Sequence, residues 1–304
     1  MNITLKFQLI LILFSATSTF GQNKRDIITN DSIYPIMHNP SNYLEVKNRI
    51  LDLEKKYGYE VELKQSLINY SYQNDDIPFF KKELSILVEK YGFQLIYLNG
   101  REFYYDAITK GELSDWFKKM FLKNHFVWLE NNFEKQIDLK KLNDIKNKDQ
   151  LINIYTGKII NEVNLDSIQK EKVSDLLYEF FFKNISELHQ IATKYDNYPT
   201  GKNFALIQND FYVAETHNLQ AKPNIERFWI LFYPYYKKAY LKNEITYVNF
   251  KSYDQWSFIH FGMQHFGLLD IDKIPPFFNE KNLTEAPIID LEFYEKMKKE
   301  FNWE

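Results

Sequence analysis

The feature that most constrains this chain is a series of apolar residues between positions 173 and 195 that recur every three or four residues. Such spacing places them on one side of an α-helix about six turns long, where they form one continuous apolar stripe. Other elements have to cover a stripe of this kind, because exposed apolar surface is unfavourable in water. Pro199 ends the predicted helix, since a proline disfavours helical backbone at the preceding residue. The stripe consists of Val173, Leu176, Leu177, Phe180, Phe181, Ile185, Leu188, Ile191, Ala192 and Tyr195.

Several other segments have the same helical spacing. One predicted helix covers 43–57 and stops at Gly58, where a left-handed cap fits glycine. Another begins with Asp76 as its N-cap and stops at Gly92. The remaining predicted helices cover 113–133, 204–216, 224–241 and 248–261. The chain is therefore predicted to be mainly α-helical, in one or two helical domains.

One segment departs from the helical pattern. The stretch FQLIYLNGREFYY, at 93–105, holds two apolar runs on either side of Asn99-Gly100. This dipeptide favours a type I′ turn, because both central residues of that turn need a positive φ. We therefore expect a small antiparallel β-hairpin near 93–105.

The expected organisation is a signal peptide over 1–21, an extended leader over 22–40, an N-terminal helical region over 41–150 and a C-terminal helical region over 151–304. The leader is expected to be extended because it has no periodicity and contains Pro35 and Pro40. The polar run KKLNDIKNKDQ at 140–150 is either a linker or the solvated face of a helix. A linker there would give two domains, and a packed helix would give one continuous domain.

The first residues, MNITLKFQLILILFSATSTFGQ, have the layout of a secretory signal peptide. Lys6 supplies a positive charge, an apolar run extends from Phe7 to Phe14, and small and hydroxyl residues follow up to Gly21. The apolar run is far shorter than the roughly 20 residues that span a bilayer, so no transmembrane anchor is predicted. We expect cleavage after Gly21 and export of the mature chain to the periplasm or the extracellular space.

The composition excludes several kinds of partner and of stabilisation. The chain has no cysteine, which rules out disulfides, cysteine zinc sites and a lipid-modified cysteine. Its net charge of -3 lacks the basic surplus that phosphate recognition needs, so no nucleic-acid partner is predicted. Aromatic residues make up 17% of the chain and could form a stacking platform for sugars, but at core spacing they are expected to fill the interior.

No established catalytic motif occurs. The chain lacks a glycine-rich phosphate loop, a Gly-x-Ser-x-Gly turn and a His-Glu-x-x-His helix, and no cofactor is predicted. His260 and His265 are five residues apart, which separates them by about 140° on a helix and does not suit two ligands of one metal. No metal site is therefore predicted.

Four polar residues within apolar sequence are the candidates for a site: His217, Asp254, Gln264 and His265. A buried polar group is unfavourable unless it is hydrogen-bonded. Such residues therefore either pair with one another to fix the fold or line a wet cavity. The sequence favours a structural role for them and leaves the cavity open as the alternative.

Short motifs in the C-terminal half carry a family resemblance. The segment LHQIATKYDNYP resembles a helix that ends in Gly-Trp-Pro, FYVAETHN resembles a Gln-His motif, and FGMQHFG resembles Gly-x-x-Gln-x-Tyr-Gly. On these matches, residues 186–267 are similar to a bacterial family known only as a domain of unknown function. The resemblance implies no activity, but it implies that His217, Asp254 and Gln264 converge. Gln255 stands where that family has arginine, so an arginine-dependent site would be lost here.

Two functions compete. The first is a non-enzymatic binding or interaction module of the cell envelope, which takes an envelope protein or a small ligand. It follows from the signal peptide and from the absence of a complete catalytic set. The alternative is a hydrolase-like enzyme in which His217 is the base, Asp254 orients it and Gln264 supplies a donor, and it requires all three side chains to meet in one cleft.

Overall fold

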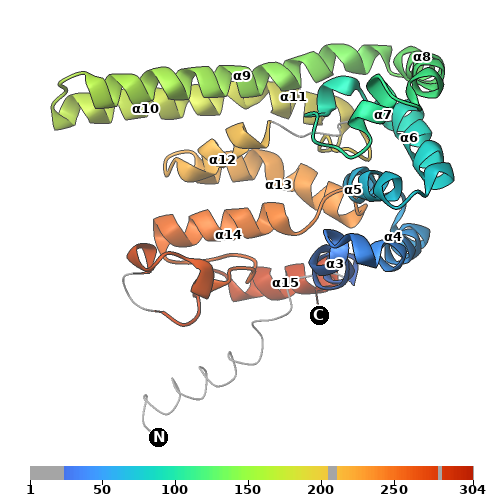
Figure 1. Ribbon diagram of the computed structural model, residues 1–304. Coiled ribbons are helices and arrows are strands. Elements are labelled where there is room, and N and C mark those ends of the chain that lie inside the picture. The colour runs from blue at the N-terminus through green and yellow to red at the C-terminus, as the bar shows by residue number, and fades with distance from the viewer. Residues whose placement is uncertain (1–23, 205–210, 280–282, 304) are drawn as a thin grey trace, which may run out of the picture.

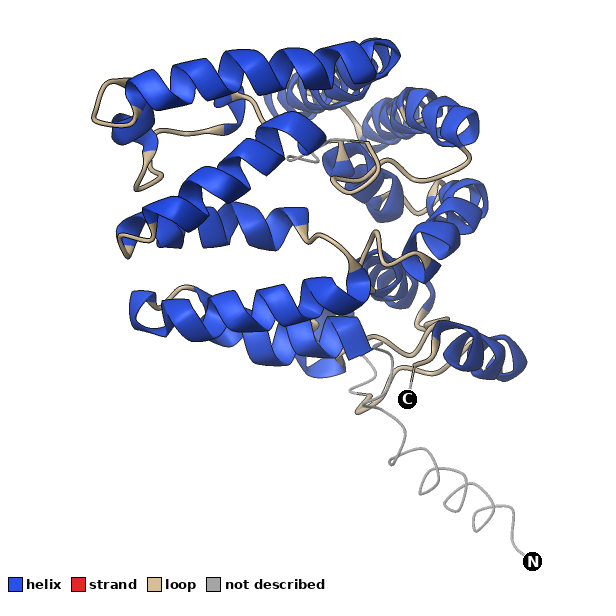
Figure 2. Ribbon diagram, turned by 90° about the vertical axis from the view of Figure 1, so that its right-hand side faces the viewer, coloured by secondary structure: helices blue, strands red, loops and turns tan. Residues whose placement is uncertain are grey.

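The structure, a computed structural model, describes residues 24–204, 211–279 and 283–303 (Figure 1). The predicted signal peptide over 1–21 lies outside these residues. The fold is mainly helical, as predicted. Figure 2 shows helices and loops only, and across the described ranges the single β-type pairing is an isolated bridge between Gln264 and Ile288.

The elements of the N-terminal half are α2 (Lys24–Ile27), the π-helix η1 (Ile28–Ile33), α3 (Tyr34–Met37), η2 (Pro40–Asn42), α4 (Tyr43–Tyr57), α5 (Val61–Gln73), α6 (Ile77–Tyr91), η3 (Leu95–Tyr97), α7 (Tyr105–Thr109), α8 (Ser114–Asn131) and α9 (Phe133–Glu162). The C-terminal half contains α10 (Ser167–Asn184), α11 (Ser186–Tyr195), α12 (Tyr212–Gln220), α13 (Ile225–Leu241), α14 (Val248–Phe261), η4 (Ile271–Lys273), η5 (Pro276–Phe278) and α15 (Leu291–Phe301).

These helices form two columns that meet along one side (Figure 1). The first column stacks α4, α5, α6 and α8 in sequence order. The second begins with α9, α10 and α11 and continues through α12, α13 and α14 to α15. The short N-terminal segment α2–α3 joins the two columns, because it packs on α4 and also bonds to the turn between α13 and α14.

That N-terminal segment differs from the prediction, since the expected leader over 22–40 is helical over 24–37 rather than extended. The cause is the burial of side chains in this segment, which the local sequence does not indicate. Arg25 and Asp26 are inaccessible to solvent between the two columns, and Ile33 and Met37 pack on α4. Helical backbone lets all four side chains face the interior over a short segment while the main-chain polar groups remain hydrogen-bonded.

The capping signals predicted α6 correctly. The Asp76 carboxylate accepts a hydrogen bond from the Phe79 amide, and Gly92 ends the helix in the left-handed region at φ 67°. A Cβ atom at residue 92 would lie only 2.3 Å from the ring of Trp128 in α8, which is a severe clash. Glycine at 92 therefore serves both the backbone conformation and the packing of α6 on α8.

The other predicted helices have a mixed outcome. The ranges 43–57 and 248–261 match α4 and α14, with Gly58 and Gly262 at positive φ at their ends. The range 113–133 matches α8 closely. For the range 204–216, α12 begins only at Tyr212, and residues 205–210 lie outside the described part of the chain.

The polar run at 140–150 lies inside α9, which continues without interruption for 30 residues. Leu139, Leu142 and Ile145 are buried on one side of this helix, and the lysines and asparagines between them face outward. The solvated-face interpretation therefore describes this run, and no linker divides the chain at 150. Among the described helices, none is both long enough and apolar enough to cross a membrane.

The apolar stripe over 173–195 does not form one straight helix. It is divided between α10 and α11, with the break at Ile185, where the Asn184 side chain donates a hydrogen bond to Ile145 O of α9. Only the C-terminal part of the stripe is buried, from Phe181 onward, whereas Leu176 is 73% exposed. Residue spacing shows which side of a helix is apolar. It does not show where the helix breaks or how much of that side other helices cover.

The prediction of a β-hairpin near 93–105 is wrong. The Asn99-Gly100 turn does form, with Gly100 at φ 81°, but side chains close it: Glu102 accepts from both turn amides, and Asn99 Oδ1 accepts from Arg101 N. The run before the turn forms η3, so no strand pairs across it. These local side-chain bonds replace the ladder bonds that a hairpin would need.

Candidate functional site

Asp254, one of the four predicted site residues, stabilises a turn. Its side chain is fully buried on α14, and its two carboxylate oxygens accept hydrogen bonds from the amides of His265, Phe266 and Leu268 at 2.7 to 3.2 Å. Burial raises the pKa of Asp254 to about 6, although these three amides favour the ionised form. The carboxylate therefore organises the chain after Gly262 and is not available to orient a histidine.

Gln264 and His265 lie on the same turn and also have structural roles. Gln264 Nε2 donates to Ala286 O at 2.8 Å, and its Oε1 accepts from Leu269 N at 3.0 Å. The ring of His265 packs against Tyr253, with a 3.4 Å contact between Nε2 and the phenol oxygen, and burial lowers the pKa of His265. Asp254, Gln264 and His265 thus meet at one turn, where the hydrogen bonds of Asp254 and Gln264 fix the path of the chain.

His217 belongs to a different cluster. Its Nδ1 lies 2.6 Å from Oδ2 of Asp149, a fully buried residue of α9, and its ring stacks on Phe181 at 4.6 Å. This pair connects α12 to α9. His217 makes no hydrogen bond with Asp254 or Gln264, so the convergence implied by the family resemblance is not seen in the described residues.

His260, the other histidine of the pair at 260 and 265, lies on α14 and contacts the backbone of α12. His260 Nε2 lies 3.1 Å from Leu219 O, which ties α14 to α12. Nowhere in ranges 24–204, 211–279 and 283–303 do three His, Cys, Asp or Glu side chains come together as metal ligands would.

A cavity of about 390 Å³ lies where the two helical columns and the N-terminal segment meet. This volume is within the range of small-molecule sites, although near its lower end. Its walls come from parts of the chain far apart in sequence, including the π-helix η1, and π-helical turns often occur at functional sites. Its polar and charged lining comprises Arg25, Thr29, Asn30, Glu60, Glu62, Thr200, Lys202, Glu215, Thr216, Glu244, Thr246, Asn249 and Ser252.

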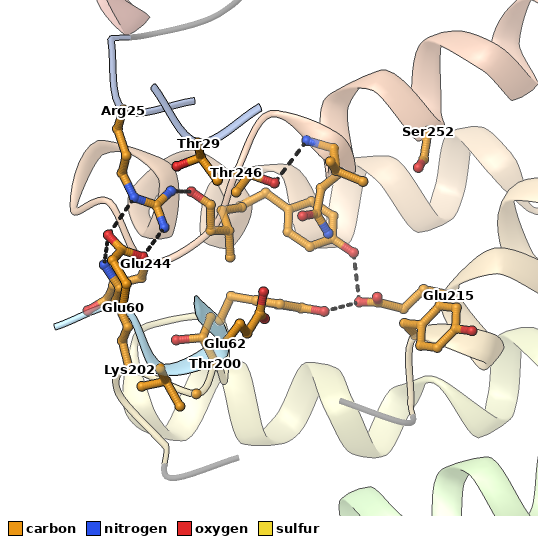
Figure 3. Close-up of a pocket in the computed structure, with 18 of the residues that line it drawn as sticks. Arg25, Thr29, Glu60, Glu62, Thr200, Lys202, Glu215, Glu244, Thr246 and Ser252 are labelled. Carbon is orange, nitrogen blue, oxygen red and sulfur yellow. Dashed lines mark hydrogen bonds and ion pairs between the residues drawn. The ribbon is translucent and has the colours of Figure 1, made fainter. Parts of the chain in front are cut away.

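One end of the cavity carries a closed ion-pair network (Figure 3). Arg25 binds Glu60 through two hydrogen bonds of 2.9 and 2.7 Å and donates a third, of 3.1 Å, to Ile245 O. Lys202 Nζ lies 2.8 Å from Glu60 Oε1. Burial lowers the pKa of Lys202, and Glu60 opposes that effect by favouring the ammonium. Both cations are therefore already matched by a carboxylate.

The other end carries Glu215, a carboxyl group on α12 that is only 5% exposed. The hydroxyls of Tyr198 and Tyr236 both donate to its Oε1, at 2.7 Å each. Burial raises the pKa of Glu215 to about 7, and the two phenols oppose that rise only in part. Among the described residues no cation lies against this carboxyl, so nothing but the two phenols opposes the effect of burial.

Two further carboxylates line the cavity without a cation of their own. Glu244 Oε2 accepts from the side-chain amides of Asn197 and Asn203, at 2.6 and 2.8 Å. Glu62, near the start of α5, has no hydrogen bond or ion pair with any described residue. The surrounding protein raises the pKa of Glu62, and repulsion from Glu60 adds to that rise.

Sequence reasoning did not find this site. Glu215 stands two residues before His217, and a charged residue in the apolar segment FYVAETHNLQ is a signal that could have identified it. No comparable signal marks Arg25 or Glu62, because the segments that carry them meet only in the folded chain.

Comparison with family models, curated proteins and solved structures finds no match to this chain. The family resemblance over 186–267 therefore stays a prediction.

Proposed function

We propose that this protein is an exported binding protein that holds a small ligand in the cavity between its two helical columns. The observation that carries the proposal is the cavity itself: it is about 390 Å³ in volume and combines aromatic walls with polar groups that the fold does not use. Thr29 illustrates the last point, because its Oγ1 is buried and has no hydrogen-bond partner in the described part of the chain. Native folds leave few such groups unsatisfied.

The position of the cavity also supports binding. Its floor and walls are joined by the N-terminal segment, which the Arg25–Glu60 pair fixes in place. Sites at the meeting of separately packed units are common places for ligands, because several parts of the chain can each supply a polar group.

A thermal-shift experiment with a small-molecule panel tests the proposal. The panel contains amines, neutral sugars and carboxylates, and it is applied to the mature chain. A ligand at a hundred times its Kd stabilises the native state by about 2.7 kcal/mol, which raises Tm by about 5 °C in a protein of this size.

A matched pair of variants locates the binding. Ser252→Trp fills the cavity from α14, and Ser174→Trp makes the same change at a half-buried position of α10 outside it. We expect the ligand shift to persist in Ser174→Trp and to vanish in Ser252→Trp. A shift that survives in Ser252→Trp, or a panel in which no compound raises Tm, contradicts the proposal.

Export is part of the proposed function and rests on the N-terminal sequence. The mature chain is proposed to begin at Gln22, three residues before Arg25 enters the cavity wall. N-terminal sequencing of protein from the envelope or culture medium tests this. Recovery of the full-length chain with Met1 from the cytoplasm alone would contradict it.

A second candidate is an acid–base enzyme that uses Glu215. The observation in its favour is a carboxyl group in a cavity with a pKa of about 7, a value suited to proton transfer at neutral pH. This candidate replaces His217 as the catalytic group, because His217 faces Asp149 and does not line the cavity. Turnover of an ester or glycoside panel that is lost in Glu215→Gln supports it, and a lack of turnover at any pH between 5 and 9 excludes it.

A further inference from the structure

The charges that line the cavity do not balance. Two cations, Arg25 and Lys202, line the cavity with four carboxylates, and Glu60 pairs with both cations. Arg25 also lies 3.6 Å from the carboxylate of Asp26. Three donors of Arg25 point to Glu60 and to Ile245 O, and its charge is already paired with carboxylates, so it is poorly placed to attract an anionic ligand. The remaining carboxylates are Glu62, Glu215 and Glu244, and none of them forms an ion pair with a described residue.

Glu215 is the best placed of the three to meet a ligand. Both phenols bind its Oε1, and Oε2 has no hydrogen-bond partner in the described part of the chain. Protein atoms do not enclose Oε2 completely, so this oxygen remains accessible from the cavity that Glu215 lines. Figure 3 places this carboxyl at the end of the cavity away from Arg25 and Lys202. An approaching cation would therefore meet an acceptor with no competing positive charge beside it.

Aromatic rings surround the same end. Tyr198 and Tyr236 lie with ring centroids 4.8 Å apart, and Trp229 lies 5.7 Å from Tyr236. All three line the cavity together with Tyr212. Aromatic faces attract cations through the ring quadrupole, and they also cover the apolar body of a ligand. A carboxylate among such rings is the usual chemistry for holding a protonated or quaternary amine.

We propose that the cavity binds an organic cation, with its ammonium group at Glu215 Oε2 and its apolar body against Trp229 and Tyr236. Glu62 adds to the negative field from the wall formed by α5. This inference rests on the proposed binding function and names the class of ligand. A metal cation does not fit, because no three suitable ligands come together in the described ranges.

Calorimetry with three matched probes tests the charge preference. Benzylamine, benzyl alcohol and benzoate share a ring and differ in charge, and each is titrated into the mature chain at pH 8. We expect benzylamine to bind at least tenfold more tightly than the alcohol, with benzoate the weakest. Equal or tighter binding of benzyl alcohol or benzoate overturns the organic-cation proposal but leaves the proposed cavity function intact, and Ser252→Trp confirms that the cavity is involved.

The variant Glu215→Gln tests the assigned residue. Glutamine keeps an oxygen that accepts from the two phenols and removes the negative charge, so the fold is preserved while the ammonium loses its partner. We expect the Kd of benzylamine to rise about tenfold or more, and Glu171→Gln, at an exposed position of α10, to leave it unchanged. An unchanged Kd in Glu215→Gln contradicts the assignment.

The pH dependence provides an independent readout. Glu215 faces the phenols of Tyr198 and Tyr236, and the other charged groups of the cavity are Arg25, Lys202, Glu60, Glu62 and Glu244. With a pKa of about 7, Glu215 is mostly ionised at pH 8 and mostly protonated at pH 6, whereas benzylamine stays protonated throughout. Affinity is expected to fall about tenfold over this range in the wild type and to stay flat in Glu215→Gln. A wild-type affinity that is constant between pH 6 and pH 8 refutes the role of Glu215.

Discussion

The ionisation of Glu215 makes a direct prediction about the stability of the protein. Burial raises the pKa of this carboxyl from its ordinary 4.5 to about 7 in the folded state. Between these two values the folded state binds the proton and the unfolded chain releases it. The free energy of unfolding therefore falls as the pH rises from 5 to 8. Above pH 7 only the two phenol hydrogen bonds offset the desolvation cost of the carboxylate, because no cation of the described part of the chain is beside it.

The size of the effect follows from the shift. A difference of one pKa unit corresponds to 1.36 kcal/mol, so the contribution lost between pH 5 and pH 8 is roughly 2 to 3 kcal/mol. Glu215→Gln removes the titration and keeps the acceptor for both tyrosine hydroxyls. The variant should therefore gain roughly 2 to 3 kcal/mol relative to the wild type as the pH increases from 5 to 8.

Urea unfolding at several pH values measures this difference. All other titrating groups are common to the wild type and the variant, so they cancel when the two free energies of unfolding are subtracted. Glu171→Gln serves as the control, and its difference from the wild type should not depend on pH. If the difference for Glu215→Gln is also independent of pH, the carboxyl does not titrate near neutrality and the reasoning about its burial is wrong.

Two other predictions concern the packing at Gly92 and the half-buried His217. Gly92→Ala should destabilise the protein by about 3 kcal/mol or more, because it adds a clash with Trp128 to the cost of a positive φ. Gly262→Ala, also in the left-handed region at φ 73° but with nothing within 4 Å of its Cβ, should cost only about 1 to 2 kcal/mol. Equal losses in thermal unfolding would refute the packing argument. His217→Ala should cost about 2 to 3 kcal/mol by leaving Asp149 buried without its partner, and it should leave ligand affinity unchanged. A loss of affinity in calorimetry would show instead that His217 acts at the site.

Local signals at helix ends predicted the bounds of two helices correctly. Asp76 and Gly92 bound α6, and Gly262 ends α14, because capping depends on residues adjacent in the chain. The same local reasoning failed at Asn99-Gly100. A turn forms there, but whether strands pair across it depends on what else the flanking residues can contact.

The candidate site could not be predicted from local sequence signals, because it depends on contacts between distant segments. Asp254 and Gln264 are close in the sequence, so they could be grouped as neighbours. Closeness in sequence does not show whether such residues bind a ligand or hydrogen-bond the backbone of a turn. The cavity is assembled from the N-terminal segment, α5, the loop after α11 and the helices α12 to α14, and several of these parts are distant in sequence. Its charge imbalance becomes visible only when Arg25 is seen to pair with Glu60 and not with Glu215.

A crystal structure of the mature chain with benzylamine at pH 8 would show whether the cavity holds an organic cation. We expect the ring against Trp229 and Tyr236, with the ammonium nitrogen about 2.8 Å from Glu215 Oε2. We also expect the hydrogen bonds from Tyr198 and Tyr236 to Oε1 to remain. A cavity closed by its own side chains, or benzylamine bound only elsewhere on the protein, would contradict the organic-cation proposal.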